Sequence, residues 1–167
     1  MGKIEPMELF TKKICWLLAA TWALIIFNLS RAPFSSASSA TFISMVLDWL
    51  SIPILSQDAD LLNTLLRKSS HLTEYAVLAV LLYSSLKPVG GPSWSRKSAF
   101  WALLASGIYS LTDEFHQLFV PGRHASLFDC LIDTTGAVLG LLVLSSAIVL
   151  LRRKQAGMVA QAAKAIP

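Results

Sequence analysis

The stretch that decides the fold is LTDEFHQLFVPGRHASLFDCLID, residues 111–133. It holds four carboxylates, two histidines and an arginine, and long apolar segments lie on both sides of it. Charges inside or beside an apolar span are tolerated where they face the interior of a helix bundle or water, and they are then usually functional. The stretch therefore predicts a polar cluster at one end of a bundle of apolar helices.

The composition of the whole chain favours a membrane protein. The 167 residues are 54% hydrophobic and 14% charged, with a mean hydropathy of +0.60, whereas a soluble domain carries about 25% charged residues. The length indicates one domain. The net charge of +4 does not indicate nucleic acid as a partner, because the basic residues flank apolar runs and form no patch with stacking aromatics. We therefore predict an integral membrane protein with membrane lipids as partners.

Four segments are long enough and apolar enough to cross a bilayer as helices, which takes about 20 residues. Their ranges are 14–30, 69–86, 99–118 and 130–151. The second and third contain acidic and histidine side chains, and we retain them because such groups can face a bundle interior. The predicted class is all-α, a polytopic membrane protein with a four-helix transmembrane bundle in residues 1–154. A disordered cytoplasmic tail is expected at residues 155–167.

The positions of lysine and arginine predict the orientation in the cell membrane. These residues concentrate in the N-terminal segment, in the loop at residues 87–97 and after residue 151. Because cytoplasmic loops carry the excess of positive charge, both termini and this loop are predicted to be cytoplasmic. A cleaved signal peptide is the alternative for the first segment. The long gap between Leu29 and the small residues near Ala40 favours retention.

The connection between the first two spans carries a helical stripe. Its apolar residues recur at i, i+3, i+4, i+7 and i+8, which is one face of a helix; they are Phe42, Met45, Val46, Trp49 and Leu50. We predict a short external amphipathic segment that lies either at the membrane surface or against the bundle.

Three polar stripes are predicted to converge in the outer half of the bilayer, one on each of the last three spans. They are Lys68, His71, Glu74 and Tyr75; Ser106, Tyr109, Ser110, Asp113 and Gln117; and Asp129 and Asp133. Gly136 and Gly140 continue the third stripe and allow close approach of another helix, so this face should turn toward the bundle. Formation of a homo-oligomer through the same two glycines is the alternative.

Basic side chains should neutralise the buried carboxylates, and Lys68, His71 and Arg123 are the nearest candidates in the sequence. We expect Asp113 and Asp129 each to have a basic partner, with Lys68 and Arg123 taking these roles, and the sequence leaves open which carboxylate pairs with which base. Ser126 is expected to cap the fourth helix.

These blocks resemble the signatures of the VanZ-like family, membrane proteins named for a teicoplanin-resistance factor. The blocks are KSSHLTEYAVLAVLLY, then LTDEFHQLFVPGR, then an Asp followed by DTTGAVLG. The residues at the family's positions are Lys68, His71, Tyr75, Asp113, Glu114, Gln117, Arg123, Asp129 and Gly136. The chain differs where the family often has Asn, at Asp133 or Thr134. The resemblance implies an effect on susceptibility to lipid-linked glycopeptides such as teicoplanin.

The predicted ligand site takes in most of these polar residues. Its members are Lys68, His71, Glu74, Tyr75, Asp113, Glu114, Gln117, Arg123, Asp129 and Asp133. Lys68 and Arg123 can hold a phosphate or carboxylate by charge-assisted hydrogen bonds, so the predicted ligand is an anionic envelope lipid or lipid-linked substrate. The alternative is a non-catalytic scaffold whose charge network only holds the helices in register. A transporter is disfavoured because the inner halves of the spans offer few polar groups.

The sequence leaves open whether any reaction is catalysed. His71 with Asp113 or Glu114 has the residue types for general acid–base chemistry, but no nucleophile motif or phosphate-binding loop accompanies them. His71, Glu74, Asp113 and His116 also have the residue types of a divalent-metal site. Because His116 lies at the margin of its polar stripe, no metal and no other cofactor is predicted.

The two cysteines are predicted to stay unpaired. Cys15 and Cys130 open their spans at opposite sides of a hydrocarbon layer about 30 Å thick, whereas a disulfide needs Cα atoms within about 7 Å.

Overall fold

The structure, a computed structural model, is all-helical over the part of the chain that it describes. That part comprises residues 6–30, 41, 44–46, 49, 56–91, 93–120 and 125–164. The long helices are α1 (Pro6–Leu29), α3 (Ser56–Leu86), α4 (Arg96–Gln117) and α5 (Leu127–Lys164). Each predicted span lies within or nearly within one of these helices, and the predicted all-α class is confirmed.

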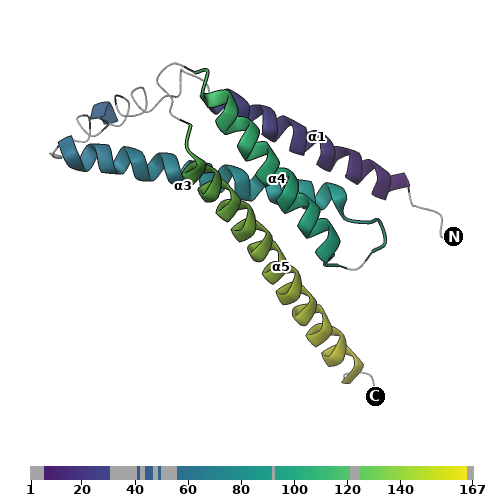
Figure 1. The fold of residues 1–167 in the computed structure, drawn as a ribbon. Helices are drawn as coiled ribbons and strands as arrows, with labels where there is room; N and C mark the ends of the chain where they lie inside the picture. The colour runs from purple at the N-terminus through teal and green to yellow at the C-terminus, as the bar shows by residue number, and fades with distance from the viewer. Residues whose placement is uncertain are drawn as a thin grey trace.

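Helix α3 is the centre of the arrangement. Helices α1, α4 and α5 all pack against it, and α4 also packs against α5. The C-terminal half of α5 runs out past the other helices (Figure 1). Because α3 is covered from several sides, its residues from Leu72 to Leu86 are mostly buried or half-buried.

Two glycines let α3 and α5 approach closely. A Cβ atom on Gly136 would overlap the backbone of Leu72, and one on Gly140 would overlap the backbone of Ala76. Small residues permit such contact between helix backbones. The prediction that this face of α5 turns toward the bundle is confirmed, since α3 of the same chain covers both glycines. Association of two chains through them stays a prediction.

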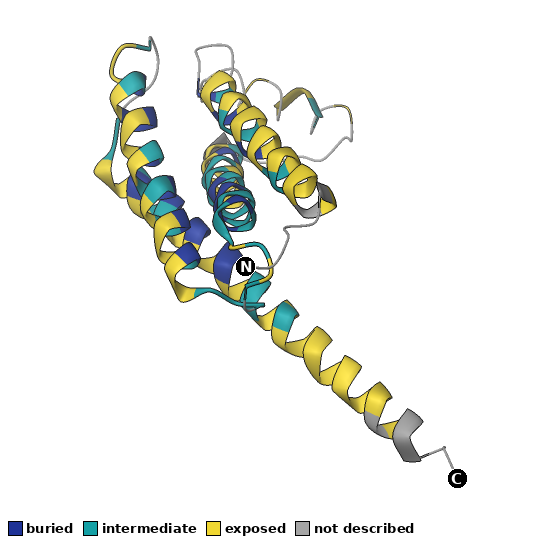
Figure 2. Ribbon diagram, turned by 90° about the vertical axis from the view of Figure 1, so that its right-hand side faces the viewer, coloured by how far each residue is buried: buried dark blue, intermediate teal, exposed yellow. Residues whose placement is uncertain are grey.

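On α4 most of the buried residues are polar and the large apolar side chains are exposed. Its buried residues are Ser98, Ala102, Ser106, Ser110, Asp113, Glu114 and Gln117. The large exposed side chains on its opposite side are Phe100, Trp101, Leu104, Ile108, Leu111 and Phe115. Figure 2 shows the same outward exposure along α1 and α5. An apolar exterior around a polar interior is the pattern of helices that face hydrocarbon and shield polar groups from it.

Two helices are long and apolar enough to cross a membrane, by length and composition, within the described residues. They contain the stretches Leu9–Leu29 and Leu127–Val159. Helices α3 and α4 do not reach the same hydropathy, because they carry the charged residues of the cluster. The four-span bundle is therefore carried forward as a proposal.

Helix α5 is longer than the sequence predicted. Its 38 residues extend over about 57 Å, well beyond a hydrocarbon thickness of about 30 Å. Residues 155–164 are helical, which differs from the expected disordered tail. Good helix formers dominate this stretch, among them Ala156, Ala160, Ala162 and Ala163, and they favour the continuation in spite of Gly157.

Helix α3 also begins earlier than the predicted second span, at Ser56 instead of residue 69. Three members of the predicted external stripe, Met45, Val46 and Trp49, lie in helical backbone; Met45 and Trp49 are exposed and Val46 is half-buried. The other two members, Phe42 and Leu50, lie outside the described residues. Both cysteines are free, as predicted.

Candidate functional site

Asp133 is the point where α3, α4 and α5 meet. His71 on α3 places its Nδ1 3.2 Å from Asp133 Oδ1, and the Ser110 hydroxyl on α4 donates to Asp133 Oδ2 at 2.6 Å. The Asp133 side chain is fully buried. The His71 contact has the distance of an ion pair, but its angles do not meet those of a directed hydrogen bond. These contacts confirm that the three polar stripes converge.

Asp113 joins α4 to the end of α1. Its Oδ2 accepts a hydrogen bond of 2.7 Å from the Ser30 hydroxyl and one of 3.1 Å from Gln117 Nε2. Of the two basic partners expected for Asp113, Lys68 forms no ion pair with it, and Arg123 lies outside the described residues; within the described residues Asp113 is held by neutral donors. A hydroxyl and an amide can stabilise a buried carboxylate without bringing a second charge out of water.

Glu114 fixes the start of α5. Its Oε2 accepts a hydrogen bond of 2.7 Å from the backbone N–H of Ser126, while the Ser126 hydroxyl accepts one of 3.2 Å from the N–H of Phe128. The predicted cap at Ser126 is therefore confirmed. Through this bond the last turn of α4 holds the first turn of α5, which orients Asp129 and Asp133 toward α3.

Aromatic residues close the cluster on the side of α1. Tyr75 is fully buried, and its ring centroid lies 6.3 Å from that of Tyr109. The Tyr109 hydroxyl donates to the Ala23 carbonyl at 2.6 Å, and Trp22 Nε1 donates to the Glu74 carbonyl at 2.9 Å. Helix α1 is thus tied by hydrogen bonds to both α3 and α4.

The cluster retains unused hydrogen-bonding capacity. Among the described residues, these buried atoms have no hydrogen-bond partner: His71 Nδ1, Tyr75 Oη, Ser106 Oγ, Asp113 Oδ1, Glu114 Oε1, His116 Nε2 and Asp133 Oδ1. Buried polar groups are normally paired, so such a concentration is unusual for a region whose role is only to pack. Most of these atoms belong to the predicted site.

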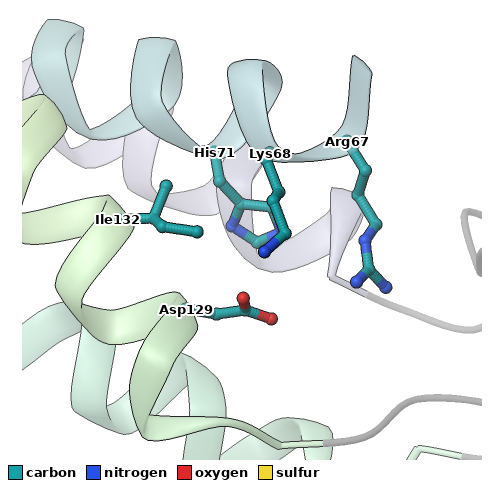
Figure 3. Close-up of a pocket in the computed structure, with 5 residues that line it drawn as sticks. All are labelled: Arg67, Lys68, His71, Asp129 and Ile132. Carbon is teal, nitrogen blue, oxygen red and sulfur yellow. The ribbon is translucent and has the colours of Figure 1, made fainter. Parts of the chain in front are cut away.

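A narrow basic crevice, called the pocket below, lies beside the buried cluster between α3 and α5, and its side chains are too close together for a water molecule to fit between them. Its lining residues are Arg67, Lys68, His71, Asp129 and Ile132. Figure 3 shows the basic side chains descending from α3 and the Asp129 carboxylate rising toward them from α5. The Lys68 ammonium lies 4.8 Å from the centroid of the Phe128 ring, a cation–π distance. It forms no ion pair with Asp129 among the described residues.

His71 belongs both to the pocket and to the cluster. Its side chain is 13% exposed and lines the pocket, while Nδ1 faces Asp133 in the interior. The other ring nitrogen, Nε2, is then the one left to meet a ligand. A carboxylate that orients an imidazole in this way is a common arrangement both in ligand binding and in proton transfer.

The remaining catalytic candidates are less accessible. Asp113 and Glu114 are 3% and 5% exposed, and neither lines the pocket beside His71. Ser110 is also fully buried and donates to Asp133. His71 is therefore the candidate best placed to touch a ligand.

The residues that the sequence offered for a metal site are His71, Glu74, Asp113 and His116, and the structure does not group them as metal ligands. Within the described part of the chain, no three His, Cys, Asp or Glu side chains are grouped so as to hold a metal ion. The ring of His116 packs against Phe27 of α1, with centroids 4.6 Å apart, and His116 does not line the pocket with His71. Glu74 is half-buried on α3, where its charge interacts with His71.

Two residues of the site were missed by sequence reasoning. Ser30 bonds to Asp113 from the end of α1, and no pattern around it indicates that role. Arg67 lines the pocket, and its position four residues before His71 puts both on one helix face, a signal that could have identified it. Arg123 and His124 lie outside the described residues.

A family model described as VanZ/LLP1 matches residues 14–151, which is most of the chain. Searches of curated proteins and of solved structures found no match. The matched range takes in α1 as well as the three helices that carry the signature blocks.

Proposed function

The chain belongs to the VanZ-like family, and on that premise we propose that it is a four-span membrane protein that binds an anionic cell-envelope headgroup. The family is membrane-associated. The bound group would be a phosphate or carboxylate of an envelope lipid or lipid-linked substrate, and the residues that contact it would be Arg67, Lys68 and His71. In cells, binding would alter susceptibility to teicoplanin.

The buried polar face and exposed apolar face of α4 support the proposal that the chain crosses the membrane four times. In water, Phe100, Ile108, Leu111 and Phe115 would stay exposed by half or more of their surface, so each would lose about 1–2 kcal/mol of the favourable transfer free energy. In a bilayer the same apolar side chains would contact hydrocarbon instead of water, while Ser106, Ser110 and Asp113 would be shielded inside the bundle. The proposed orientation keeps both termini in the cytoplasm, which puts the pocket in the outer leaflet.

The basic pocket is the observation that carries the proposed ligand. A guanidinium and an ammonium on adjacent residues can bind phosphate oxygens by charge-assisted hydrogen bonds. The pocket lies at the end of α5 that begins after the connection from α4, where headgroups would be at the same depth. His71 would hold a third position on the bound group, with Asp133 fixing the orientation of the ring.

Binding can be measured with phosphatidylglycerol as the probe. Detergent-solubilised protein would be titrated with this lipid and bound lipid counted by native mass spectrometry. Lys68→Met should weaken binding by about tenfold, as expected for loss of one hydrogen bond to a charged group. Lys97→Met is the matched control, because Lys97 is an exposed residue in the first turn of α4. Equal affinity of the two variants would contradict the proposed site.

A scaffold is the second candidate, and the hydrogen-bond network favours it specifically. Ser30, Ser110 and His71 join carboxylates to α1, α4 and α3 in turn. Such buried polar contacts can serve only to fix helix register. Two variants separate the readings: a scaffold predicts that Asp113→Asn lowers thermal stability and that Lys68→Met leaves teicoplanin susceptibility in cells unaltered, whereas a binding site predicts altered susceptibility in Lys68→Met even where stability is retained.

A further inference from the structure

The pocket contains a carboxylate where an anion-binding site would have no need of one. Asp129 lines the same pocket as Arg67, Lys68 and His71, and its side chain points across the gap toward them (Figure 3). A carboxylate placed there repels a purely anionic ligand. Its presence therefore restricts which headgroups the pocket can accept.

We infer that the headgroup bound here is dipolar, with a phosphate held by the basic residues of α3 and a primary ammonium held by Asp129. This inference rests on the proposed function and deepens it by naming the ligand class. The charges of the pocket are arranged in two layers, positive on α3 and negative on α5. A phosphate carrying an amine a few bonds away has the matching arrangement.

The cation–π contact of Lys68 supports a ligand role for its ammonium. If Asp129 served only as the counter-ion of Lys68, the two would be expected to pair directly. Instead, the Lys68 ammonium lies over the ring of Phe128, 4.8 Å from its centroid, and no ion pair joins it to Asp129 within the described chain. The ammonium can exchange its contact with the ring for a contact with a phosphate, since both interactions stabilise the positive charge. A ligand needs such a movement, because no water molecule fits in the crevice as it stands, and Lys68 can swing from Phe128 onto a ligand without breaking an ion pair among the described residues.

The carboxylate also discriminates between kinds of ammonium. A primary ammonium donates up to three hydrogen bonds to carboxylate oxygens, whereas a quaternary ammonium donates none. Ile132 contributes an apolar wall, which suits the short methylene link between phosphate and amine. Phosphatidylethanolamine therefore matches the pocket better than phosphatidylglycerol, which lacks the amine, and better than phosphatidylcholine, whose amine is methylated.

The test compares headgroups on wild-type protein and on Asp129→Asn. Detergent-solubilised protein is titrated separately with phosphatidylethanolamine, phosphatidylglycerol and phosphatidylcholine, and bound lipid is counted by native mass spectrometry. Wild type should bind phosphatidylethanolamine most tightly. Asp129→Asn should lose about tenfold in affinity for that lipid and should bind phosphatidylglycerol as well as or better than wild type does. Free glycerophosphoethanolamine as competitor separates a soluble ligand, which it would displace fully, from a lipid whose chains contribute.

Asp58→Asn is the matched control, because Asp58 also lies in the first turn of a helix but outside the pocket. It removes the same favourable interaction with a helix N-terminus and should leave the lipid preference unchanged. If Asp129→Asn fails to fold, Asp129→Glu, which keeps the charge, must retain the preference for phosphatidylethanolamine.

Failure of this inference is distinct from failure of the proposed function. Wild type that binds phosphatidylglycerol more tightly than phosphatidylethanolamine would overturn the dipolar ligand while leaving an anion site. The same holds if Asp129→Asn lowers thermal stability and leaves the order of affinities unchanged, since Asp129 would then be a structural counter-ion. Absence of any saturable lipid binding that depends on Lys68 would overturn the proposed function itself.

Discussion

Replacing Gly136 by alanine should separate α3 from α5 and disturb the site without touching a charged residue. The three atoms nearest to an added Cβ are the carbonyl oxygen, carbonyl carbon and Cα of Leu72, all of them backbone. No side-chain rotation can relieve such a contact, so the helices must move apart by about 1 Å to reach ordinary van der Waals separation. His71 precedes Leu72, and Asp133 lies three residues before Gly136. The same movement therefore stretches the 3.2 Å contact between His71 and Asp133.

The expected loss of stability follows from two opposing effects. Overpacking at a rigid contact costs about 3 kcal/mol or more, while alanine gains about 1 kcal/mol over glycine in a helix. The net loss is about 2–3 kcal/mol. At about 2–4 °C per kcal/mol for a chain of this size, Tm should fall by about 4–12 °C.

The chain offers two matched controls in the same assay, thermal unfolding of the purified protein. A Cβ on Gly107 would meet only Thr134 Oγ1, at 4.0 Å, and one on Gly157 would meet nothing within 4 Å. Gly107→Ala and Gly157→Ala should therefore leave Tm unchanged or raise it slightly. A Gly136→Ala protein as stable as these two would refute the close packing of α3 on α5.

Three further predictions follow from the hydrogen bonds, the cysteines and the proposed orientation. Ser30→Ala removes a donor to a buried carboxylate and should destabilise the protein by about 1.5–3 kcal/mol; Ser69→Ala, an exposed control whose hydroxyl bonds within its own helix, should unfold at the wild-type temperature. Cys15 and Cys130 should give no disulfide-linked peptide by mass spectrometry after mild oxidation, and such a peptide would contradict the topology. In a chain whose native cysteines are serine, Pro88→Cys should react with a membrane-impermeant thiol reagent only after the cells are permeabilised; labelling of intact cells would reverse the proposed orientation.

The convergence of the polar stripes could be predicted because helical periodicity is a local property of the sequence. His71, Ser110, Asp113 and Asp133 were placed on inward faces by spacing alone, and the glycines after Asp133 identified the face that meets another helix. Cap chemistry at Ser126 was equally local. Each of these inferences needed only the positions of residues within one helix.

Pairing across helices was decided by the tertiary structure. The sequence predicted a basic partner for Asp113, either Lys68 or Arg123; among the described residues the structure supplies Ser30 and Gln117, because the end of α1 lies against the last turn of α4 and brings a hydroxyl there. Lys68 lies on the side of α3 that faces α5, where it contacts Phe128 and lines the pocket. A buried carboxylate can pair with more than one side chain, and the angle and position at which the helices cross decide which of them it contacts. The residue pattern within one helix carries no information on how that helix crosses the others.

The sequence by itself determined the helical class, the polar faces and their location at one end of the bundle, because periodicity and hydropathy act residue by residue along the chain. Only the tertiary structure separated the polar residues into a buried cluster around Asp113, Glu114 and Asp133 and a narrow, half-buried crevice around Lys68 and Asp129. His71 lies at the boundary between the two. That division depends on which side of α5 packs against α3, and the backbone contact at Gly136 sets it, since no other residue would allow the two helices to lie so close.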